Sequence, residues 1–470
     1  MGHYNPEKYV TAATEALRGI PPLHLTGRIA SLSGLMAEVA GLSGQLAVGS
    51  RLLLHPRHGP GRAGPVLAEV VGFRGTLART MAFGSLDGLG PGAASLMPVR
   101  RHAGGFVLGE GGTLAPTDAW LGRVIDPLGH PLDGGGPLPQ GPAPRPVRAA
   151  PPPAAARARL GPRLDLGVRA LDCFATTRQG QRLGLFAGSG VGKSTLLAML
   201  ARGAATDVTV LALVGERGRE VREFIEDELG PEGLARAVIV VATSDAPPLL
   251  RREAAHAAMT VAEHFRDQGR QVLLMMDSVT RFCLALREIG LSAGEPPATR
   301  GYPPSVFAEL PRLLERAGPG LQPPQGDARP PGHITALFTV LVEGDDHNEP
   351  VADAVRGILD GHVVLDRRIA EAGRYPAIDV LRSLSRAAAG CLGAEEAALI
   401  RRARAILALY ADMADLVRLG AYRAGADPAV DEAVTLAPRI EAVLAQDRAS
   451  ASDIDDGFAA LRAALETNAP

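Results

Sequence analysis

The chain has 470 residues, and at about 150 residues per domain this length predicts roughly three domains with ample chain for a buried core. Hydrophobic residues make up 46% and the net charge is −2, which excludes a disordered chain and argues against a nucleic-acid-binding surface over the whole protein. The three cysteines, Cys173, Cys283 and Cys391, are too few and too far apart for a disulfide scaffold or a cysteine metal site.

The first ninety-odd residues are typical of short β-strands separated by turns that contain Gly and Pro. Apolar residues alternate loosely through residues 24–40, and apolar runs follow at 45–54, 66–73 and 80–83. Short strands at this close spacing predict a small barrel or a sandwich. Ahead of them, residues 6–17 place apolar side chains at helical spacing. This short amphipathic helix either packs on its own barrel or docks a partner.

A stretch rich in Pro, Gly and Ala follows at residues 130–162, and it cannot sustain long helices or strands. One interpretation is a simple linker between independent domains. The other is a loop that belongs to the next domain, because the sequence LGRVIDPLG at 121–129, just before it, has the pattern of ordered structure.

From residue 183 to 342, short apolar runs alternate with helical patterns. Such runs are typical of parallel strands covered on both faces, and the alternation predicts a parallel α/β sheet. The expected strands are 182–187, 208–214, 237–242, 272–277 and 334–342.

The last eighty residues are helical in pattern. Residues 394–422 are rich in Ala, Leu and Arg, Asp427-Pro428 starts a second helix, and Ser452 with Asp455 starts a third in capping-box fashion. No apolar run approaches the ~18 residues that a membrane span needs, and the N-terminus lacks the pattern of a signal peptide. We therefore expect a cytoplasmic chain, divided at 1–96, 97–386 and 387–470 into β, α/β and α domains.

A phosphate-binding loop is the strongest local signal. Residues 187–194 read AGSGVGKS, the P-loop pattern with Ala at its first glycine position, between a predicted strand and a predicted helix. The glycines let backbone N–H groups curl around phosphate oxygens, and the helix N-terminus adds its partial positive charge. We predict that Lys193 reaches the β- and γ-phosphates and that Ser194 ligates Mg²⁺. The predicted nucleotide-binding residues of this loop are Gly188, Ser189, Gly190, Val191, Gly192, Lys193, Ser194 and Thr195.

Two carboxylates complete the predicted site. Asp277 closes the apolar run VLLMMD, so it lies at the carboxyl end of a strand, where an Asp can hold Mg²⁺. Glu216 leaves another apolar strand at the same edge, where a carboxylate can orient or deprotonate the attacking water. Alternatively, Glu216 is an exposed residue of a salt-bridged turn.

Taken together, these motifs resemble those of the F1-type rotary ATPase superfamily, more narrowly the type III secretion ATPases and most closely the flagellar export ATPases. The resemblance runs from about residue 25 to about residue 446, and the 294–318 segment points to the export branch. It is carried by GRVIDPLGHPLDG at 122–134, LFAGSGVGKS at 185–194, LVGERGRE at 213–220, DSVTRFCLALR at 277–287, GEPPATRGYPPSVFAELPRLLERAG at 294–318, EGDDHNEPVADAVRGILDGHVVL at 343–365 and YPAIDVLRSLSR at 375–386.

The resemblance implies an α/β fold with a RecA-like P-loop core and its parallel sheet, an N-terminal small β-barrel and a C-terminal helical domain. It also implies a homohexamer that hydrolyses ATP with Mg²⁺ between neighbouring subunits. Glu216 falls on the family's catalytic glutamate, Tyr375 on the aromatic residue that packs against adenine, and Arg386 on the arginine finger that reaches the neighbour's γ-phosphate. Without the resemblance, Tyr375 would be read as core packing and Arg386 as part of a surface ion pair.

The function that the resemblance implies is ATP hydrolysis for flagellar type III protein export, at the cytoplasmic side of the inner membrane by peripheral association. Its implied partners are a stator dimer, a coiled-coil stalk protein, the membrane export gate and chaperone–cargo complexes, with no nucleic acid. The alternatives are an injectisome ATPase, a rotary ATP synthase subunit, an RNA-translocating hexamer and a nucleotide-binding subunit without turnover. The rotary α-subunit carries Gln where this chain has Glu216, and an acidic motif of the rotary β-subunit is absent here.

Overall fold

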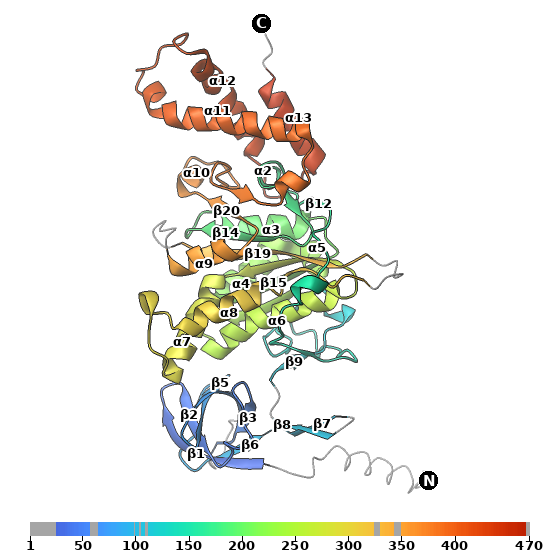
Figure 1. The fold of residues 1–470 in the computed structure, drawn as a ribbon, viewed down its shortest axis with the longest axis vertical. Helices are drawn as coiled ribbons and strands as arrows, with labels where there is room; N and C mark the ends of the chain where they lie inside the picture. The colour runs from blue at the N-terminus through green and yellow to red at the C-terminus, as the bar shows by residue number, and fades with distance from the viewer. Residues whose placement is uncertain are drawn as a thin grey trace, which may run out of the picture. The chain divides into compact units, whose positions relative to one another are not determined.

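The computed structural model describes residues 25–56, 64–97, 99–102, 105–108, 111–323, 330–342 and 349–466. The helix predicted at 6–17 lies outside these residues, as does the beginning of the 343–365 motif. The described chain forms two compact units. The first holds residues up to Thr113 with Ala246–Leu250 and Ala285–Pro297, and the second holds the rest, including the sheet and the C-terminal helices (Figure 1).

The N-terminal strands close into an antiparallel barrel in the order β1–β2–β5–β4–β3–β6, which confirms the predicted barrel. Its strands are β1 (Leu25–Ser33), β2 (Met36–Ala40), β3 (Arg51–Leu54), β4 (Val66–Arg74), β5 (Leu77–Ala82) and β6 (Ala94–Met97). Alternate apolar side chains fill the interior, among them Ile29, Leu52 and Val70, each at most 1% exposed. The segment predicted at 24–40 is a hairpin, because Gly34 adopts φ 57° and turns the chain between β1 and β2.

The Pro-rich stretch is a loop of the second unit and not a linker. The indole of the fully buried Trp120 donates a hydrogen bond to the carbonyl of Pro139 at 2.8 Å. Further along the loop, the carbonyl of Val147 accepts a hydrogen bond from the buried guanidinium of Arg316 at 2.7 Å. These contacts satisfy backbone groups of a segment that has almost no regular structure.

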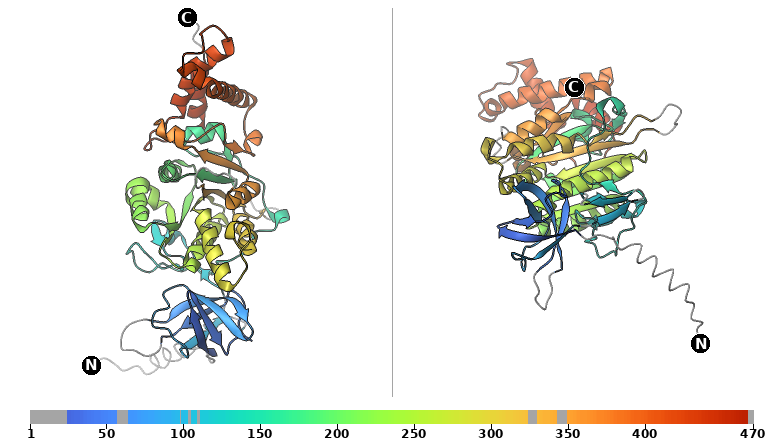
Figure 2. Two further views of the ribbon diagram at one scale, coloured as in Figure 1. Left: turned by 90° about the vertical axis from the view of Figure 1, so that its left-hand side faces the viewer. Right: turned by 60° about the horizontal axis from the view of Figure 1, so that its bottom comes forward.

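The second unit is built on one sheet in the order β10–β16–β15–β17–β19–β14–β20–β21. Neighbours from β10 to β20 run parallel, and the predicted strands appear within two residues of their expected ends. Helices cover both faces (Figure 2), as expected from strands such as β15 and β17 that are buried at nearly every position. The strands are β10 (Arg123–Ile125), β14 (Arg182–Ala187), β15 (Val208–Glu216), β16 (Ala237–Thr243), β17 (Gln271–Asp277), β18 (Gly318–Pro319), β19 (His333–Leu341), β20 (Gly361–Leu365) and β21 (Leu384–Ser385).

The helices of the described chain are α2 (Arg169–Phe174), α3 (Lys193–Gly203), α4 (Gly218–Glu223), α5 (Gly230–Ala235), α6 (Pro248–Arg266), α7 (Val279–Ala293), α8 (Pro304–Leu314), α9 (Pro350–Ile358), α10 (Arg367–Glu371), α11 (Ala394–Arg418), α12 (Pro428–Leu444) and α13 (Ile454–Leu465). The helices from α3 to α10 alternate with strands of the sheet, as expected of an α/β fold, and α11 to α13 follow one another after the last strand. Among the described helices, none combines the length and the apolar character that crossing a bilayer requires.

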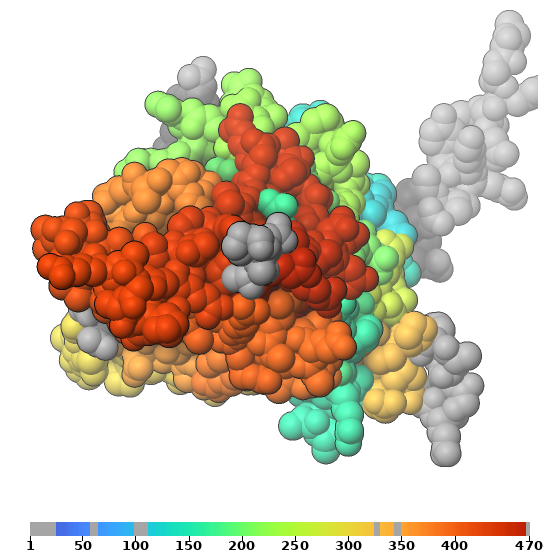
Figure 3. Space-filling view, turned by 90° about the horizontal axis from the view of Figure 1, so that it is seen from above, coloured from blue at the N-terminus to red at the C-terminus, as the bar shows by residue number. Residues whose placement is uncertain are grey.

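The predicted C-terminal helical domain is α11, α12 and α13, which take up much of the face seen in Figure 3. Asp427 caps α12 as predicted, because its side chain accepts a hydrogen bond from the backbone N–H of Ala429. The cap predicted for the third helix was wrong by one residue. Asp453, not Ser452, is the N-cap of α13 and accepts from the backbone N–H of Asp456 at 2.7 Å.

Candidate nucleotide-hydrolysis site

The phosphate-binding loop lies between the end of β14 and the start of α3. Residues 188–192 form the loop, and Lys193, Ser194 and Thr195 form the first turn of the helix. Gly190 has φ 76° and Gly192 has φ 86°, a left-handed conformation that glycine adopts without strain. A loop of this kind at a helix N-terminus can present its backbone N–H groups to an anion.

Lys193 lies between two carboxylates that come from neighbouring strands. Its Nζ is 2.5 Å from Oδ1 of Asp277, at the end of β17, and 3.5 Å from Oε1 of Glu216, at the end of β15. Parallel strands bring their carboxyl ends to the same edge of the sheet, so all three side chains meet beside the loop. Their side chains are 13%, 5% and 12% exposed, in the order Lys193, Asp277, Glu216.

One carboxylate oxygen of Glu216 is buried and can accept a hydrogen bond. Its Oε1 makes no hydrogen bond within the described residues and faces only the cations of Lys193, at 3.5 Å, and Arg281, at 3.6 Å. Burial raises the pKa of Glu216, Lys193 opposes this shift, and the nearby Asp277 adds to it. A buried carboxylate oxygen without a hydrogen bond is costly, and together with the raised pKa and the position beside the P-loop it makes Glu216 a candidate catalytic residue.

Ser194 and Asp277 provide the kind of oxygen donors that Mg²⁺ takes. Mg²⁺ usually binds one or two protein oxygens, with phosphates and waters completing its shell. One oxygen of Asp277 already accepts hydrogen bonds from Thr339 Oγ1 at 2.7 Å and from Lys193, whereas Ser194 is exposed at the start of α3. Within the described ranges, no group of three or more His, Cys, Asp or Glu residues is arranged to hold a metal ion.

Tyr375 lies over the same loop. A Cβ atom placed on Gly192 would come within 3.3 Å of Cδ1 and Cε1 of the Tyr375 ring. Tyr375 as a whole residue is 46% exposed, so its ring contacts the loop without being enclosed. This differs from the core packing considered as an alternative, because a core tyrosine would be enclosed.

Arg386 lies at the opposite end of the sheet from the loop. Its backbone N–H donates at 2.9 Å to the carbonyl of Asp360, and the carboxylate of Asp360 accepts from the backbone N–H of Arg182, the first residue of β14. The loop begins after the last residue of that strand, Ala187. Five steps of about 3.3 Å separate these ends by ~17 Å. The Arg386 side chain is exposed and makes no hydrogen bond or ion pair within the described residues.

The sequence patterns missed three contributors to this site. Arg281 faces Glu216, Thr339 binds Asp277, and Nη2 of Arg367 donates to the carbonyl of Ser189 in the loop at 3.0 Å. Arg281 lies within the DSVTR motif and could have been found from it. Thr339 and Arg367 carry no local signal, because only the pairing of β17 with β19 and the return of the chain after β20 bring them to the site.

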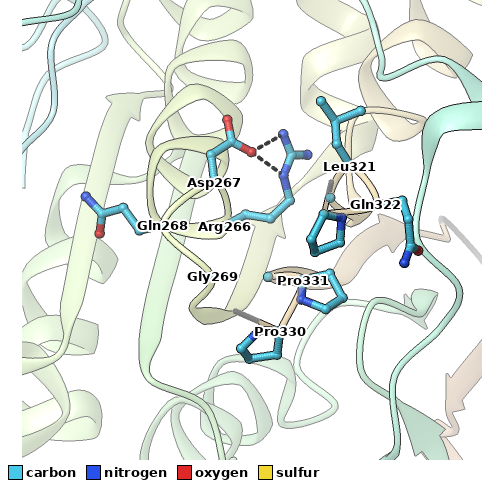
Figure 4. Close-up of a pocket in the computed structure, with 11 residues that line it drawn as sticks. Arg266, Asp267, Gln268, Gly269, Leu321, Gln322, Pro330 and Pro331 are labelled. Atoms are coloured by element: carbon cyan, nitrogen blue, oxygen red, sulfur yellow. Dashed lines mark hydrogen bonds and ion pairs between the residues drawn. The ribbon is translucent and has the colours of Figure 1, made fainter. Parts of the chain in front are cut away.

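A cavity of about 310 Å³ lies elsewhere in the second unit (Figure 4). It is lined by the end of α6 and by the Pro- and Gly-containing segments around 320–323 and 330–332. The first residues of β17 and β19 follow directly after these segments, so the cavity is at the amino end of the sheet. None of the predicted nucleotide-binding residues lines it.

A P-loop at the carboxyl edge of a parallel sheet, with a lysine between two carboxylates, defines a P-loop nucleotide hydrolase. The model of the ATP synthase alpha/beta family, nucleotide-binding domain, matches residues 167–385, and that of the T3SS EscN ATPase C-terminal domain matches residues 392–463. The chain is 56% identical to the flagellum-specific ATP synthase of Caulobacter vibrioides over 452 residues. This aligned stretch covers 96% of this chain and 98% of that protein.

Two further proteins extend this similarity. The type 3 secretion system ATPase of Xanthomonas euvesicatoria is 46% identical over 426 residues, which cover 89% of this chain and 88% of that protein. The assembled ATPase EscN of the enteropathogenic E. coli type III secretion system superposes with a TM-score of 0.81 at 38% identity, over 94% of this chain and 100% of that one. The same values hold for EscN in complex with its central stalk EscO. The chain belongs to the family of the flagellum-specific ATP synthases and type III secretion ATPases, and it is a P-loop ATPase.

Proposed function

We propose that this protein hydrolyses Mg²⁺–ATP at the subunit interfaces of a homohexamer, and so energises or primes protein export by the flagellar type III apparatus. The observation that carries the proposal is the meeting of Lys193, Glu216 and Asp277 beside the P-loop in a chain this similar to flagellum-specific ATP synthases. The assembled form of EscN supports the oligomer.

Each side chain has one role in the proposed hydrolysis. The ammonium of Lys193 binds the β- and γ-phosphate oxygens, and the loop N–H groups surround them. Ser194 and Asp277 would hold Mg²⁺, which supplies neutralisation of the charge that develops on the phosphates. Glu216 accepts a hydrogen bond from the attacking water and orients it toward the γ-phosphorus. Tyr375 packs against the adenine ring.

Arg386 completes the site of the neighbouring subunit. Because its backbone is fixed at the far end of β14, it does not reach the loop of its own chain. The backbone is well anchored: Ser385 Oγ donates to the carbonyl of Thr176 at 2.7 Å and accepts from Gln181 Nε2 at 2.9 Å. A rigidly held, exposed guanidinium suits a cation supplied in trans.

The partners of this protein are proposed from its relatives. The complex of EscN with its central stalk EscO supports a stalk protein as a partner, and the family resemblance implies that this protein is a coiled coil. A stator dimer, the membrane export gate and chaperone–cargo complexes follow from the family resemblance alone. We place the protein in the cytoplasm, bound peripherally to the inner membrane through these partners.

Deleting the gene is expected to abolish flagellar filaments and swimming. Export substrates should then accumulate in the cell, since the apparatus lacks its ATPase. Electron microscopy and a motility assay measure this result, and restoring the gene on a plasmid is the control.

The second candidate is an injectisome ATPase, favoured by the similarity to the Xanthomonas protein. Normal flagella together with lost effector secretion would establish that function instead.

Nucleotide binding at the P-loop can be measured by the chemical labelling of lysine side chains. The sequence contains only two lysines, Lys8 and Lys193. Mg²⁺–ATP should protect Lys193 from a small amine-reactive reagent, because the phosphates engage its ammonium, while the labelling of Lys8 should not change. Mass spectrometry of the labelled peptides measures both residues in one sample. Equal labelling of Lys193 with and without nucleotide would refute the P-loop assignment.

A further inference from the structure

The loop that carries Tyr375 is held in shape by the side chain before it. Arg374 is buried to the extent that only 9% of its side chain is exposed. Its guanidinium donates to the carbonyl of Pro376 at 3.1 Å and to that of Ile378 at 2.9 Å. The Arg374 side chain therefore holds the backbone that follows Tyr375, and so it helps to set the direction of the Tyr375 ring.

Arg374 is in turn attached to the C-terminal helical domain. Its Nε lies 2.6 Å from Oε2 of Glu441, which is near the end of α12 and is 43% exposed. A partly buried guanidinium keeps its charge most readily beside a carboxylate, and this ion pair links the Tyr375 loop to α12.

A second attachment comes directly after α12. The backbone N–H of Gln446 donates to the carbonyl of Tyr375 itself at 2.9 Å. The side chain of Gln446 is 7% exposed and fully engaged: Nε2 donates to the carbonyls of Gly167 at 2.8 Å and Ser450 at 3.0 Å, and Oε1 accepts from the N–H of Arg169 at 3.0 Å. Gln446 therefore fixes the Tyr375 backbone to the segment that leads into α2.

We propose that Glu441 and Gln446 are positioning residues, through which the C-terminal helical domain holds the Tyr375 ring against the P-loop and so sets the affinity for the base of the nucleotide. This inference rests on the proposed role of Tyr375 at adenine. Coupling of this kind is reciprocal, so a partner that draws α12 away from Arg374 weakens ATP binding, and bound ATP holds α12 in place.

The proposal separates base binding from phosphate binding. Lys193, Ser194 and the loop N–H groups are contributed by α3 and the P-loop, and neither Glu441 nor Gln446 contacts them. Loss of the ion pair between Glu441 and Arg374 should therefore weaken the binding of ATP. It should not change the binding of a ligand that has phosphates but no base. An effect of about 5-fold or more on the Kd of ATP is expected for a coupling of ordinary strength.

The experiment compares two ion pairs of the same helix in the full-length protein. Glu441→Gln removes the carboxylate that faces Arg374 and keeps the shape of the side chain. Glu432→Gln is the matched control, because Glu432 is also on α12, is 39% exposed and pairs at 2.6 Å with Arg402 of α11, away from Tyr375. Calorimetry measures the Kd of ATP and of inorganic tripolyphosphate for both variants, for Tyr375→Ala and for the unmodified protein. Steady-state kinetics give KM and kcat.

We expect Glu441→Gln and Tyr375→Ala to raise the Kd and KM for ATP. Glu441→Gln should keep kcat within about twofold and leave the Kd of tripolyphosphate unchanged, and Glu432→Gln should behave like the unmodified protein. If Tyr375→Ala weakens ATP binding and Glu441→Gln does not, the positioning role is refuted and the proposed function stands. If Glu441→Gln weakens the binding of tripolyphosphate as much as that of ATP, the positioning role is also refuted, since the substitution then disturbs the P-loop. No effect of Tyr375→Ala would refute the adenine assignment itself.

Discussion

Replacing Glu216 with glutamine is expected to lower kcat by about 10²–10⁴ while ATP still binds. Glutamine has the same shape, so the pocket beside Lys193 remains filled, but a neutral amide is a weaker acceptor for the attacking water. Single-turnover hydrolysis measures the loss, and the Kd of ATP measures the retained binding. The result separates an ATPase from a nucleotide-binding subunit without turnover, because the latter would show no hydrolysis to lose.

A matched control lies four residues away. Glu220 is 48% exposed, lies in the first turn of α4 and pairs at 3.0 Å with Arg217, the residue before this helix. Glu220→Gln should leave kcat within about twofold of its starting value, since a solvent-exposed ion pair contributes little. Hydrolysis at the ordinary rate in Glu216→Gln would remove Glu216 from the mechanism.

The pH profile gives a second readout of Glu216. Burial raises the pKa of this carboxyl above its ordinary value of about 4.3, with Asp277 and Glu220 adding to the shift and Lys193 and Arg281 opposing it. Because the ionised form accepts the hydrogen bond from water, activity is present above the raised pKa and is lost as the pH falls through it. The acid limb of kcat should therefore lie above that of an exposed glutamate, and it should be absent from the residual activity of Glu216→Gln.

Local sequence patterns predicted the features of this protein that are formed by residues adjacent in the chain. The P-loop, Asp277 and Glu216 each follow an apolar run directly, so the end of a strand fixes where they lie. Four strands of the sheet escaped prediction: β10, β18 and β21 have only two or three residues, which carry no periodicity, and the five residues of β20 lie in the 343–365 motif, to which no strand was assigned. The loop at 130–162 was ambiguous because its hydrogen bonds are made to residues outside it, such as Trp120 and Arg316. The family resemblance, and not the pattern, indicated Tyr375 and Arg386.

Contacts between segments that are distant in the chain could not be predicted. Gln446 lies in a connection between helices and has no motif, yet its N–H meets the carbonyl of Tyr375. Arg374 is one of many arginines in the chain, and only the packing of α12 gives it Glu441 as a partner. Such pairs depend on how elements pack, which a single sequence does not encode locally.

Arg386→Ala is expected to lower kcat by about 10³–10⁵ and to leave the subunit folded with its own P-loop intact. The backbone of Arg386 lies at the amino end of β14, ~17 Å from where the loop begins, and this distance supports the proposal that its cation acts on another subunit. Arg382→Ala is the control, because Arg382 is exposed in the same segment and pairs with Asp366 of its own chain at 3.4 Å. It should keep ordinary activity.

Mixing variants tests the action in trans. A ring that combines Arg386→Ala with Glu216→Gln subunits contains interfaces where an intact P-loop and Glu216 of one chain face the intact Arg386 of the other. Part of the activity should therefore return, although each variant alone is nearly inactive. Mixing Arg386→Ala with the double variant Glu216→Gln/Arg386→Ala restores no complete site and should stay inactive. If the first mixture, shown by light scattering to form hexamers, is as inactive as the second, Arg386 does not supply a cation to its neighbour.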